Sequence, residues 1–433
     1  MRRTMAWVYD LLATAALAAA SPYLLWRRLR HPAEMRERWA GGAPWRDHGA
    51  VWWHAASVGE LEALRPVLEL IRGERPELRH AVTLLTPTGR ARARSMWDEA
   101  IEVRMLPLDW RPVVKRHLER LAPRALILVE TEIWPAMLAG VHDRSIPAAI
   151  INGRISQRTF GRYKALYSFF KPLLAGLTCV GARTAADADA FTSLGVPRER
   201  IRVTGNTKYA LPPRVADPVA WIKTGDWDAI LVLGSVRSEE LPALSQALAV
   251  LQRDLPPELR TLVVLAPRHL ERAGIFASAA RQAGFPVVLR SNLAGPMEPA
   301  GGKTHCAVIL DTLGELADLW WTASAGMVGG TLAPIGGHNL YEPISRSCPI
   351  VFGPSTETVA DVAEALQGGG GGRRVASGEE LGRALVELAS LRPLRREAAE
   401  RARRTAEELA GGARRTVEWL RECGVLRAES GGR

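Results

Sequence analysis

The chain has few cysteines. Its 433 residues include four, at positions 179, 306, 348 and 423, and no two of them form a C-x-x-C pair. No histidine stands at metal-ligand spacing beside any of them, so the usual signature of a zinc site is missing. The scarcity and wide spacing argue against a disulfide framework and favour a reducing compartment.

Several catalytic motifs are also missing. The chain has no G-x-S-x-G turn, no H-E-x-x-H helix and no G-x-G-x-x-G after the first predicted strand. Asp187 and Asp189 superficially resemble the paired aspartates of metal-dependent transferases. However, Thr184 and Gly195 are typical of the cap and the end of a helix, on which residues two apart face different directions. We expect no protease, no nucleotide hydrolase and no metal site.

Lysine is rare as well, since only six of the 57 basic residues are lysines, while the formal net charge is +11. Such an excess of positive charge predicts an anionic partner, which can be nucleic acid, an acidic membrane surface or a phosphorylated substrate. A GC-rich genome also produces an arginine bias. The charge alone therefore does not choose among these partners.

The N-terminus carries an apolar stretch over residues 5–26, with Asp10 as its only charge. About 20 such residues are enough to span a bilayer core of ~30 Å as a helix. More arginines follow the stretch than precede it, which predicts a body on the cytoplasmic face of an inner membrane. A cleaved signal peptide is disfavoured by the same arginines. Because tryptophans stand among them, a helix lying in the membrane interface is the other form of anchor that we expect.

Beyond residue 48, short apolar runs alternate with amphipathic stretches, a pattern typical of parallel strands joined by helices. The predicted strands of the first half are 50–55, 80–85, 101–106, 125–130, 147–152, 177–181 and 201–204. Those of the second half are 229–234, 261–266, 286–290, 306–311, 325–329 and 349–352. The sequence predicts an α/β protein with two Rossmann-like, doubly wound domains.

The same pattern predicts five consecutive parts of the chain. They are a membrane anchor (1–30), an N-terminal Rossmann-like domain (31–209), a proline-bearing linker (210–228), a C-terminal Rossmann-like domain (229–400), and C-terminal helices with a tail (401–433). The five glycines at 368–372 predict a flexible loop within the C-terminal domain.

Glycine and polar residues follow several predicted strands at their carboxyl ends, where open α/β sheets bind ligands. The first strand runs into a Ser57-Val58-Gly59-Glu60 turn, and Glu60 opens the next predicted helix. A glutamate in a first helical turn commonly only compensates the helix dipole, by about 0.3–1 kcal/mol. Its place at the mouth of the sheet makes Glu60 a candidate general base.

Three loops of the second half have the same character. Glycines ahead of a helix leave backbone N–H groups for a phosphate, and an arginine can add a charged hydrogen bond. Together the loops predict a nucleotide site. The loops comprise residues 266–269 after one strand, 311–316 after another and 329–343 after a third.

In these motifs the chain resembles the 3-deoxy-D-manno-oct-2-ulosonic acid (Kdo) transferases of lipopolysaccharide assembly. The motifs occur in the family's order along nearly the whole chain and include HAASVGE (54–60), LVETEIWP (128–135), VTGNTKY (203–209), LAPRH (265–269), DTLGEL (311–316) and GGHNLYEP (336–343). The resemblance implies a GT-B fold with two Rossmann-like domains facing a cleft. It also implies inverting transfer of Kdo from CMP-Kdo to a lipid A precursor, lipid IVA, without a metal or other cofactor.

The resemblance assigns roles to individual residues. Glu60 corresponds to the family's general base, and Glu130 and Lys208 to residues that stabilise the transition state. The resemblance also implies that the three loops of the second half bind CMP, through Pro267, Arg268, Leu313, Gly314, Glu315, Gly337, His338, Asn339, Leu340 and Glu342. One loop departs from the family, which usually has GSTH-x-GEE where this chain has GSVRSEE at 234–240. The histidine and one glycine of the family motif are replaced there, and Arg237 is the residue of this loop that can reach a phosphate.

An anionic lipid acceptor needs a docking face, and residues 151–164 are a candidate. If this stretch is helical, Arg154, Arg158 and Arg162 share one face. A merely solvated basic helix explains the same spacing.

Other functions stay open at this stage. A membrane-bound GT-B transferase of a UDP-sugar and a sugar-nucleotide epimerase are alternatives, and the epimerase needs no anchor. An anchored nucleic-acid binder predicts basic strands interleaved with aromatic residues, which the sequence lacks, so we expect no nucleic-acid partner.

Overall fold

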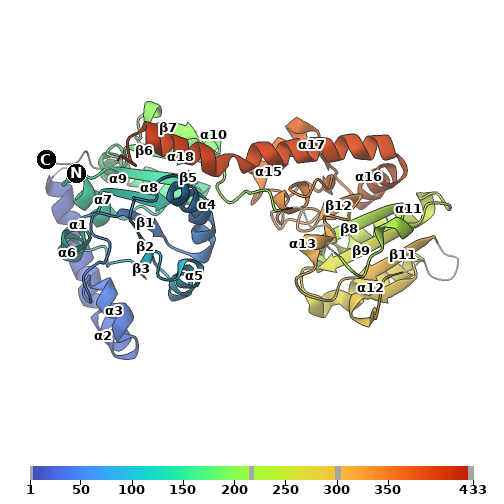
Figure 1. The fold of residues 1–433 in the computed structure, drawn as a ribbon, viewed down its shortest axis with the longest axis horizontal. Helices are drawn as coiled ribbons and strands as arrows, with labels where there is room; N and C mark the ends of the chain where they lie inside the picture. Colours follow the sequence, from blue (N-terminus) through green and yellow to red (C-terminus); the bar gives the residue numbers. More distant parts are fainter. Residues whose placement is uncertain (1–2, 214–218, 298–303, 428–433) are drawn as a thin grey trace. The chain divides into compact units, whose positions relative to one another are not determined.

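The computed structural model describes residues 3–213, 219–297 and 304–427. These residues form two compact units (Figure 1). The first unit comprises the chain up to Tyr209 together with the segment from Ala410 onward, and the second comprises Ala210–Leu409. The predicted anchor, linker and tail extend beyond the described residues at 1–2, 214–218 and 428–433.

The first unit is built on a parallel sheet of seven strands in the order β3-β2-β1-β4-β5-β6-β7. The strands are β1 (Val51–Ala55), β2 (His80–Leu84), β3 (Glu102–Met105), β4 (Ala125–Val129), β5 (Ala148–Gly153), β6 (Cys179–Ala182) and β7 (Ile201–Val203). The chain winds outward from β1 to one edge and then returns to β4 on its other side. This reversal opens a crevice at the carboxyl ends of β1 and β4.

The second unit repeats this plan in the order β10-β11-β9-β8-β12-β13-β14, with its reversal between β8 and β12. The strands are β8 (Ala229–Val236), β9 (Thr261–Pro267), β10 (Val287–Leu289), β11 (His305–Ile309), β12 (Ala325–Val328), β13 (Ile350–Phe352) and β14 (Gly372–Arg374). Two Rossmann-like α/β units are therefore present, as the sequence predicts.

Helices connect the strands and cover both sheets. Those of the first unit are α1 (Arg3–Ala19), α2 (Ser21–Arg30), α3 (Pro32–Arg38), α4 (Val58–Glu74), α5 (Pro87–Trp97), α6 (Arg111–Leu121), α7 (Pro135–His142), α8 (Gln157–Ala165), α9 (Tyr167–Leu174), α10 (Ala185–Ser193) and α18 (Gly412–Glu422). Those of the second unit are α11 (Leu241–Asp254), α12 (Ala273–Gln282), α13 (Leu316–Leu319), α14 (Tyr341–Ile344), α15 (Ala360–Gly369) and α16 (Gly378–Ser390). Helix α17 (Arg392–Ala410) ends at the boundary between the units.

Side chains along the strands of the first sheet alternate between its two faces, and each face contributes to a separate hydrophobic core. Trp52 and Leu126 point to one face, where they pack with α6, α7, α9 and α10, whereas Trp53 and Ile127 point to the other. That second face is covered by α4, α5 and α18, whose Val417 and Leu420 are buried in the core. The C-terminal helix is thus an integral part of the N-terminal fold.

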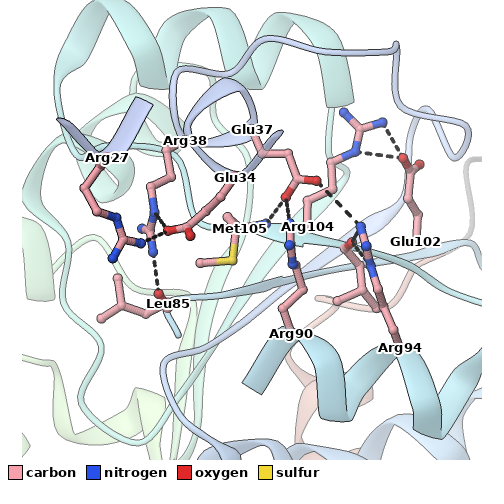
Figure 2. A network of polar contacts seen from close by, with 11 residues as sticks. Arg27, Glu34, Glu37, Arg38, Leu85, Arg90, Arg94, Glu102, Arg104 and Met105 are labelled. Atoms are coloured by element: carbon pink, nitrogen blue, oxygen red, sulfur yellow. Dashed lines mark hydrogen bonds and ion pairs between the residues drawn. The ribbon is translucent and has the colours of Figure 1, made fainter. Parts of the chain in front are cut away.

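The N-terminal helices are fastened to the carboxyl edge of the first sheet by charged side chains (Figure 2). The buried Glu34 carboxylate accepts hydrogen bonds from Arg27 at 2.5 Å and Arg38 at 2.9 Å, and Arg38 also donates to the Leu85 carbonyl. Glu37 accepts from Arg90 at 2.7 Å and from the Met105 amide at 2.9 Å. Because Leu85 directly follows β2 and Met105 is the last residue of β3, the network places α3 at the edge where ligands bind.

The apolar N-terminal stretch forms two helices, because the chain bends at Ala20 between α1 and α2. Among the helices in the described residues, none combines the length and the apolar character needed to cross a membrane. Helix α1 is bonded to the loop after β3, where Tyr9 donates to Asp109 at 2.5 Å and Trp110 donates to Thr14 at 3.1 Å. Large apolar side chains of both helices are nevertheless exposed, namely Leu11, Leu12, Tyr23, Leu25, Trp26 and Leu29.

Two expectations about local structure are wrong. The glycines at 368–372 do not form a flexible loop, because they end α15, turn at Gly370 and begin β14. A Cβ at Gly371 would lie 2.6 Å from the Ala402 backbone, so the close approach of α17 requires glycine there. Part of the expected linker is also packed, since Trp221 and Trp227 are buried.

Candidate functional site

Glu60 lies at the start of α4, directly after β1. Ser57 caps this helix by accepting a hydrogen bond from the Glu60 amide, and the Glu60 carboxylate accepts one from the Ala56 amide at 2.6 Å. The arrangement resembles a capping box, except that the glutamate accepts from the residue before the cap and not from the cap residue itself. Local sequence therefore fixes the orientation of the Glu60 carboxylate.

The environment of Glu60 disfavours its charged form. Burial raises the pKa of Glu60 to about 7 against the opposing effect of the Ala56 hydrogen bond, and the negative charges of Glu132 and Glu130 raise it further. A carboxyl group with a pKa near the working pH can both accept and release a proton. Glu60 thus combines a structural role with the properties of a general base.

Glu130 and Lys208 lie in direct contact, although 78 residues separate them in the sequence. The Lys208 ammonium is 3.0 Å from a Glu130 carboxylate oxygen, and Asn152 donates to the same oxygen at 3.4 Å. Glu130 directly follows β4 and has a φ of 59°, in the left-handed region that few non-glycine residues adopt. Strain of this kind persists where surrounding bonds hold it and is common at functional sites.

The turn that carries Lys208 is bonded to the helix that carries Glu60. The Thr207 hydroxyl donates to the Ala63 carbonyl of α4 at 2.7 Å, and the Thr207 amide donates to the Asn152 side chain at 3.1 Å. Through these bonds the structure brings together Glu60, Glu130 and Lys208, the three catalytic candidates of the sequence, at the crevice between β1 and β4.

Three further polar residues belong to this site and were missed by the sequence analysis. They are His54 in β1, Glu132 after β4 and Asn152 in β5. His54 and Asn152 are fully buried, and a polar residue within an otherwise apolar strand is the signal that identifies them. Glu132 is the second glutamate of the VETE motif, in which only the first was considered.

In the second unit, a buried glutamate joins the two loops that flank the reversal between β8 and β12. The Glu240 carboxylate accepts from the Thr331 amide at 3.1 Å, the Leu332 amide at 3.0 Å and the Arg237 amide at 3.0 Å. It lies in the short 3-10 helix Ser238–Glu240. The loop that departs from the family motif therefore retains a defined structural function.

Cationic side chains gather around this crosslink. Arg268 follows Pro267, the buried last residue of β9, and its amide donates to the Val236 carbonyl at 2.8 Å, while its side chain is exposed. Burial lowers the pKa of His338, and the positive charges of Arg268 and Arg237 lower it further. The charges of Arg237 and Arg268 therefore both act on His338.

The glycine-rich loop of this unit does not act in the way we expected. The amides of Gly336, Gly337 and His338 are already bonded to Ser355, Gly330 and Gly329 respectively, so they are not left for a phosphate. Helix α14, which follows this loop, and helix α13, which follows the loop of Leu313–Glu315, have only four residues each, which gives them little dipole. The exposed cationic side chains are the better candidates for holding an anion.

The remaining candidates of the second unit lie in the same loops with different surroundings. Glu315 is paired with Arg290 at 2.9 Å, and Leu313 and Gly314 before it are exposed. Leu340 is buried, whereas Asn339 is exposed and accepts from the Tyr341 amide at 3.1 Å. The backbone carbonyl of Glu342 accepts hydrogen bonds from Ser345 and Arg346.

The basic stretch of the first unit differs from its expected form. Arg158 and Arg162 are exposed on α8, but Arg154 precedes the helix, so the three arginines do not form one helical face.

The two aspartates Asp187 and Asp189 lie on α10. Thr184 caps α10 as predicted, while Asp187 is buried and accepts from the Ile155 amide at 2.9 Å. In the described part of the chain, histidine, cysteine, aspartate and glutamate side chains nowhere gather in threes to hold a metal ion.

Comparisons with known proteins agree on one family. The family model described as 3-deoxy-D-manno-octulosonic-acid transferase (kdotransferase) matches residues 28–211. The chain is similar to the 3-deoxy-D-manno-octulosonic acid transferase of Bordetella pertussis, with 32% identity over 94% of this chain and 98% of that protein. The enzyme of the same name from Aquifex aeolicus is 30% identical over 79% of this chain and 87% of its own length.

A solved structure supports the fold. The glycosyltransferase from Rickettsia africae covers 88% of this chain and all of its own, with a TM-score of 0.58 and 10% identity. At that identity the likeness concerns the fold alone, which agrees with the GT-B architecture of two Rossmann-like units.

Proposed function

Because the chain belongs to the Kdo transferase family and is a glycosyltransferase, we propose that it transfers Kdo from CMP-Kdo to lipid IVA, a lipid A precursor. The transfer inverts the anomeric centre, needs no metal ion and serves the assembly of the lipopolysaccharide core. The observation that supports this most directly is the cluster of Glu60, Glu130 and Lys208 at the crevice of the first unit.

Glu60 serves as the general base in this proposal. It accepts the proton of the acceptor hydroxyl as that oxygen attacks the anomeric carbon of Kdo, while the bond to the CMP phosphate breaks. In the transition state the sugar ring gains positive charge, as in an oxocarbenium ion, while Kdo also carries a negative carboxylate. The ion pair of Lys208 with Glu130 stabilises these charges.

The second unit holds the donor. The guanidinium groups of Arg268, which is exposed, and of Arg237, which is partly buried and paired with Glu239 at 2.9 Å, suit a single phosphate, for which charged hydrogen bonds are the usual means of recognition. With Glu240 fixing the loop of Arg237, the cations are held before the donor arrives. This arrangement offsets the phosphate charge without a metal ion.

We also propose that the protein acts at the cytoplasmic face of the inner membrane. The exposed apolar side chains of α1 and α2 stand beside Arg27, Arg28 and Arg30, a combination typical of helices that lie in the interface of an anionic bilayer. The exposed Arg158 and Arg162 of α8 are available to the phosphates of the lipid acceptor.

One assay tests the proposed reaction. The purified protein is incubated with CMP-Kdo and a tetra-acylated disaccharide bisphosphate in detergent, with and without EDTA, and the lipid is analysed by mass spectrometry. We expect the mass of one or more Kdo residues to be added in both samples. Transfer from a UDP-sugar in place of CMP-Kdo, or loss of transfer in EDTA, would contradict the proposal.

A further inference from the structure

Helix α7 is capped by a residue from another part of the chain. It begins at Pro135, and the preceding Trp134 makes no side-chain capping bond. The amides of Ala136 and Met137 donate instead to the two carboxylate oxygens of Asp109, at 3.1 and 2.8 Å. A carboxylate at a helix N-terminus satisfies amides that the helix leaves unpaired and opposes the positive end of its dipole. The loop after β3 therefore supplies the cap of α7.

Helix α1 adds a third hydrogen bond to this cap. The Tyr9 hydroxyl donates to Oδ2 of Asp109 at 2.5 Å, the same oxygen that accepts from the Ala136 amide. The Tyr9 ring stacks on Phe169, with centroids 5.8 Å apart, and packs against the same hydrophobic core as Trp134. Packing of the ring thus holds the hydroxyl in place, and Asp109 joins α1 to the start of α7.

The start of α7 is also the end of the segment that carries Glu130. Residues 130–134 connect β4 with α7. At the first end of this segment, the Glu130 amide donates to the Ile151 carbonyl at 3.0 Å, and at the second end Asp109 holds the helix. Because so short a segment is fixed at both ends, a shift of the α7 start is transmitted to Glu130, whose φ of 59° needs such support. The contact of Glu130 with Lys208 then depends on both attachments.

We propose that Tyr9 and Asp109 are positioning residues for the catalytic cluster, and that the docking of α1 on the first unit holds Glu130 in its catalytic position. Helix α1 then contributes to turnover as well as to membrane binding. Loss of its contact with Asp109 leaves the donor site of the second unit intact and disturbs the geometry of Glu130 and Lys208. This inference rests on the proposed role of Glu130 in the transfer of Kdo.

Tyr9→Phe tests the connection, because it removes one hydroxyl and keeps the ring. In the full chain, with acceptor in detergent micelles so that membrane binding does not limit the rate, kcat should fall about tenfold while KM for CMP-Kdo is unchanged. Asp109→Asn should lower kcat further, since a neutral amide group has one oxygen in place of two acceptors. In the Glu130→Gln background, Tyr9→Phe should have no additional effect on kcat, because the hydroxyl acts through Glu130.

Thr14→Val is the matched control. It removes another hydrogen bond between α1 and the loop after β3, that of the Trp110 indole at 3.1 Å, which does not involve α7. Its kcat should equal that of the parent. Amide hydrogen exchange of the segment 130–142, measured without substrates, gives a second readout. Exchange should become faster in Tyr9→Phe and Asp109→Asn but not in Thr14→Val.

The outcomes separate this inference from the proposed reaction. Unchanged exchange or unchanged kcat in Tyr9→Phe, or an equal loss of kcat in Thr14→Val, would overturn the inference. Full turnover of Glu130→Gln would contradict the proposed catalytic role of Glu130, while the exchange results would still support the attachment of α1 to α7. If Asp109→Asn does not fold, Tyr9→Phe decides alone, since it removes only one exchangeable hydroxyl.

Discussion

At the scale of single residues, Glu60 shows why a helix cap and a catalytic base need not exclude each other. The bonds with Ala56 and Ser57 at the helix start fix Glu60, and the same position exposes its carboxylate to the charges of Glu130 and Glu132. A cap in water gains from being charged, but here burial and two neighbouring carboxylates oppose the charge. The cost of ionising Glu60 is what suits it to proton transfer.

The first prediction concerns catalysis by this residue. Glu60→Gln keeps an oxygen that can accept from the Ala56 amide, so the fold and the affinity for CMP should be unchanged. Turnover should fall by ~10²–10⁴-fold, the range typical for the loss of a general base. Steady-state kinetics and calorimetry with CMP measure the two effects. Glu62→Gln on the same helix is the matched control, and near-normal turnover of Glu60→Gln would leave only the capping role.

A second prediction follows from the direction of the Glu60 pKa. Since the folded state raises this pKa to about 7, the folded protein holds more protons than the unfolded chain between about pH 4.5 and 7. The stabilisation from protonated Glu60 is therefore lost as pH rises through that window. Glu60→Gln, which cannot ionise, should match the parent in Tm near pH 5 and exceed it by ~2–4 °C near pH 8. A constant Tm difference across this range would contradict the raised pKa.

A third prediction concerns the donor site. Arg268→Ala should weaken CMP binding by ~1.5–3 kcal/mol, as expected for a lost charged hydrogen bond. Arg237→Ala should weaken it as well if that residue replaces the family's histidine at the phosphate. Arg253→Ala on α11, which is paired with Asp254, is the control. Unchanged calorimetric affinity in both loop variants would remove this cluster from the site.

Some contacts of single residues could not be predicted from the sequence, and the reasons are physical. Glu60, Glu130 and Lys208 belong to motifs whose resemblance to a family assigns their roles. The 3.6 Å approach of His54 Nε2 to Glu132 depends on the pairing of β1 with β4, which Glu132 follows. The engagement of the Gly336 and Gly337 amides likewise depends on loops distant in sequence. No local pattern encodes such contacts.

At the scale of elements, the C-terminal helix α18 supports the turn that carries Lys208. Arg415 donates to the Thr204 carbonyl at 3.0 Å, and the Thr416 hydroxyl donates to that of Thr204 at 3.0 Å. A Cβ on Gly412 would lie 2.5 Å from the Asn206 carbonyl oxygen, so the helix start and the turn are in close contact. The position of Lys208 thus depends on a segment more than 200 residues away.

The fourth prediction tests this support. Gly412→Val should push α18 away from the 204–208 turn, lower the Tm and reduce turnover at least about tenfold, because Lys208 loses its contact with Glu130. CMP affinity, a property of the second unit, should stay unchanged. Gly274→Ala places a methyl group in open space on α12 and is the control. Thermal unfolding, kinetics and calorimetry report the three quantities, and full turnover in Gly412→Val would refute the coupling.

Strands were easier to predict from sequence than the elements around them. Each of the 13 predicted runs overlaps a parallel strand of the structure, although β7 and β10 are not fully buried. The short edge strand β14 was missed because its residues, Gly372–Arg374, are polar and follow a glycine run. The bend at Ala20 was missed because hydropathy measures the apolar length of residues 5–26, whereas the bonds of Tyr9 and Thr14 depend on the distant loop after β3.

At the scale of the whole molecule, two sheets with the same winding each place their functional loops beside a reversal of strand order. The first unit carries the carboxylates and Lys208, and the second carries the cationic loops. In the proposed reaction, proton transfer belongs to the first unit and donor binding to the second. Variants of the first unit should therefore alter turnover alone, and variants of the second should alter donor affinity. The predictions above use this difference as an internal control.

The last prediction concerns the membrane. Replacing the exposed Leu12, Leu25 and Leu29 with glutamate removes apolar area from α1 and α2 and repels anionic lipid, while the bonds of Tyr9 and Thr14 to the body remain. Binding to vesicles of anionic phospholipid should fall at least about tenfold, and residual binding should weaken further with salt, because arginines act through a screened field. Turnover on acceptor in vesicles should fall more than turnover on acceptor in micelles, since membrane binding supplies effective concentration and not chemistry. Leu391→Glu, an exposed leucine of the second unit, is the control. Unchanged flotation of the triple variant with vesicles would place the membrane contact on another surface.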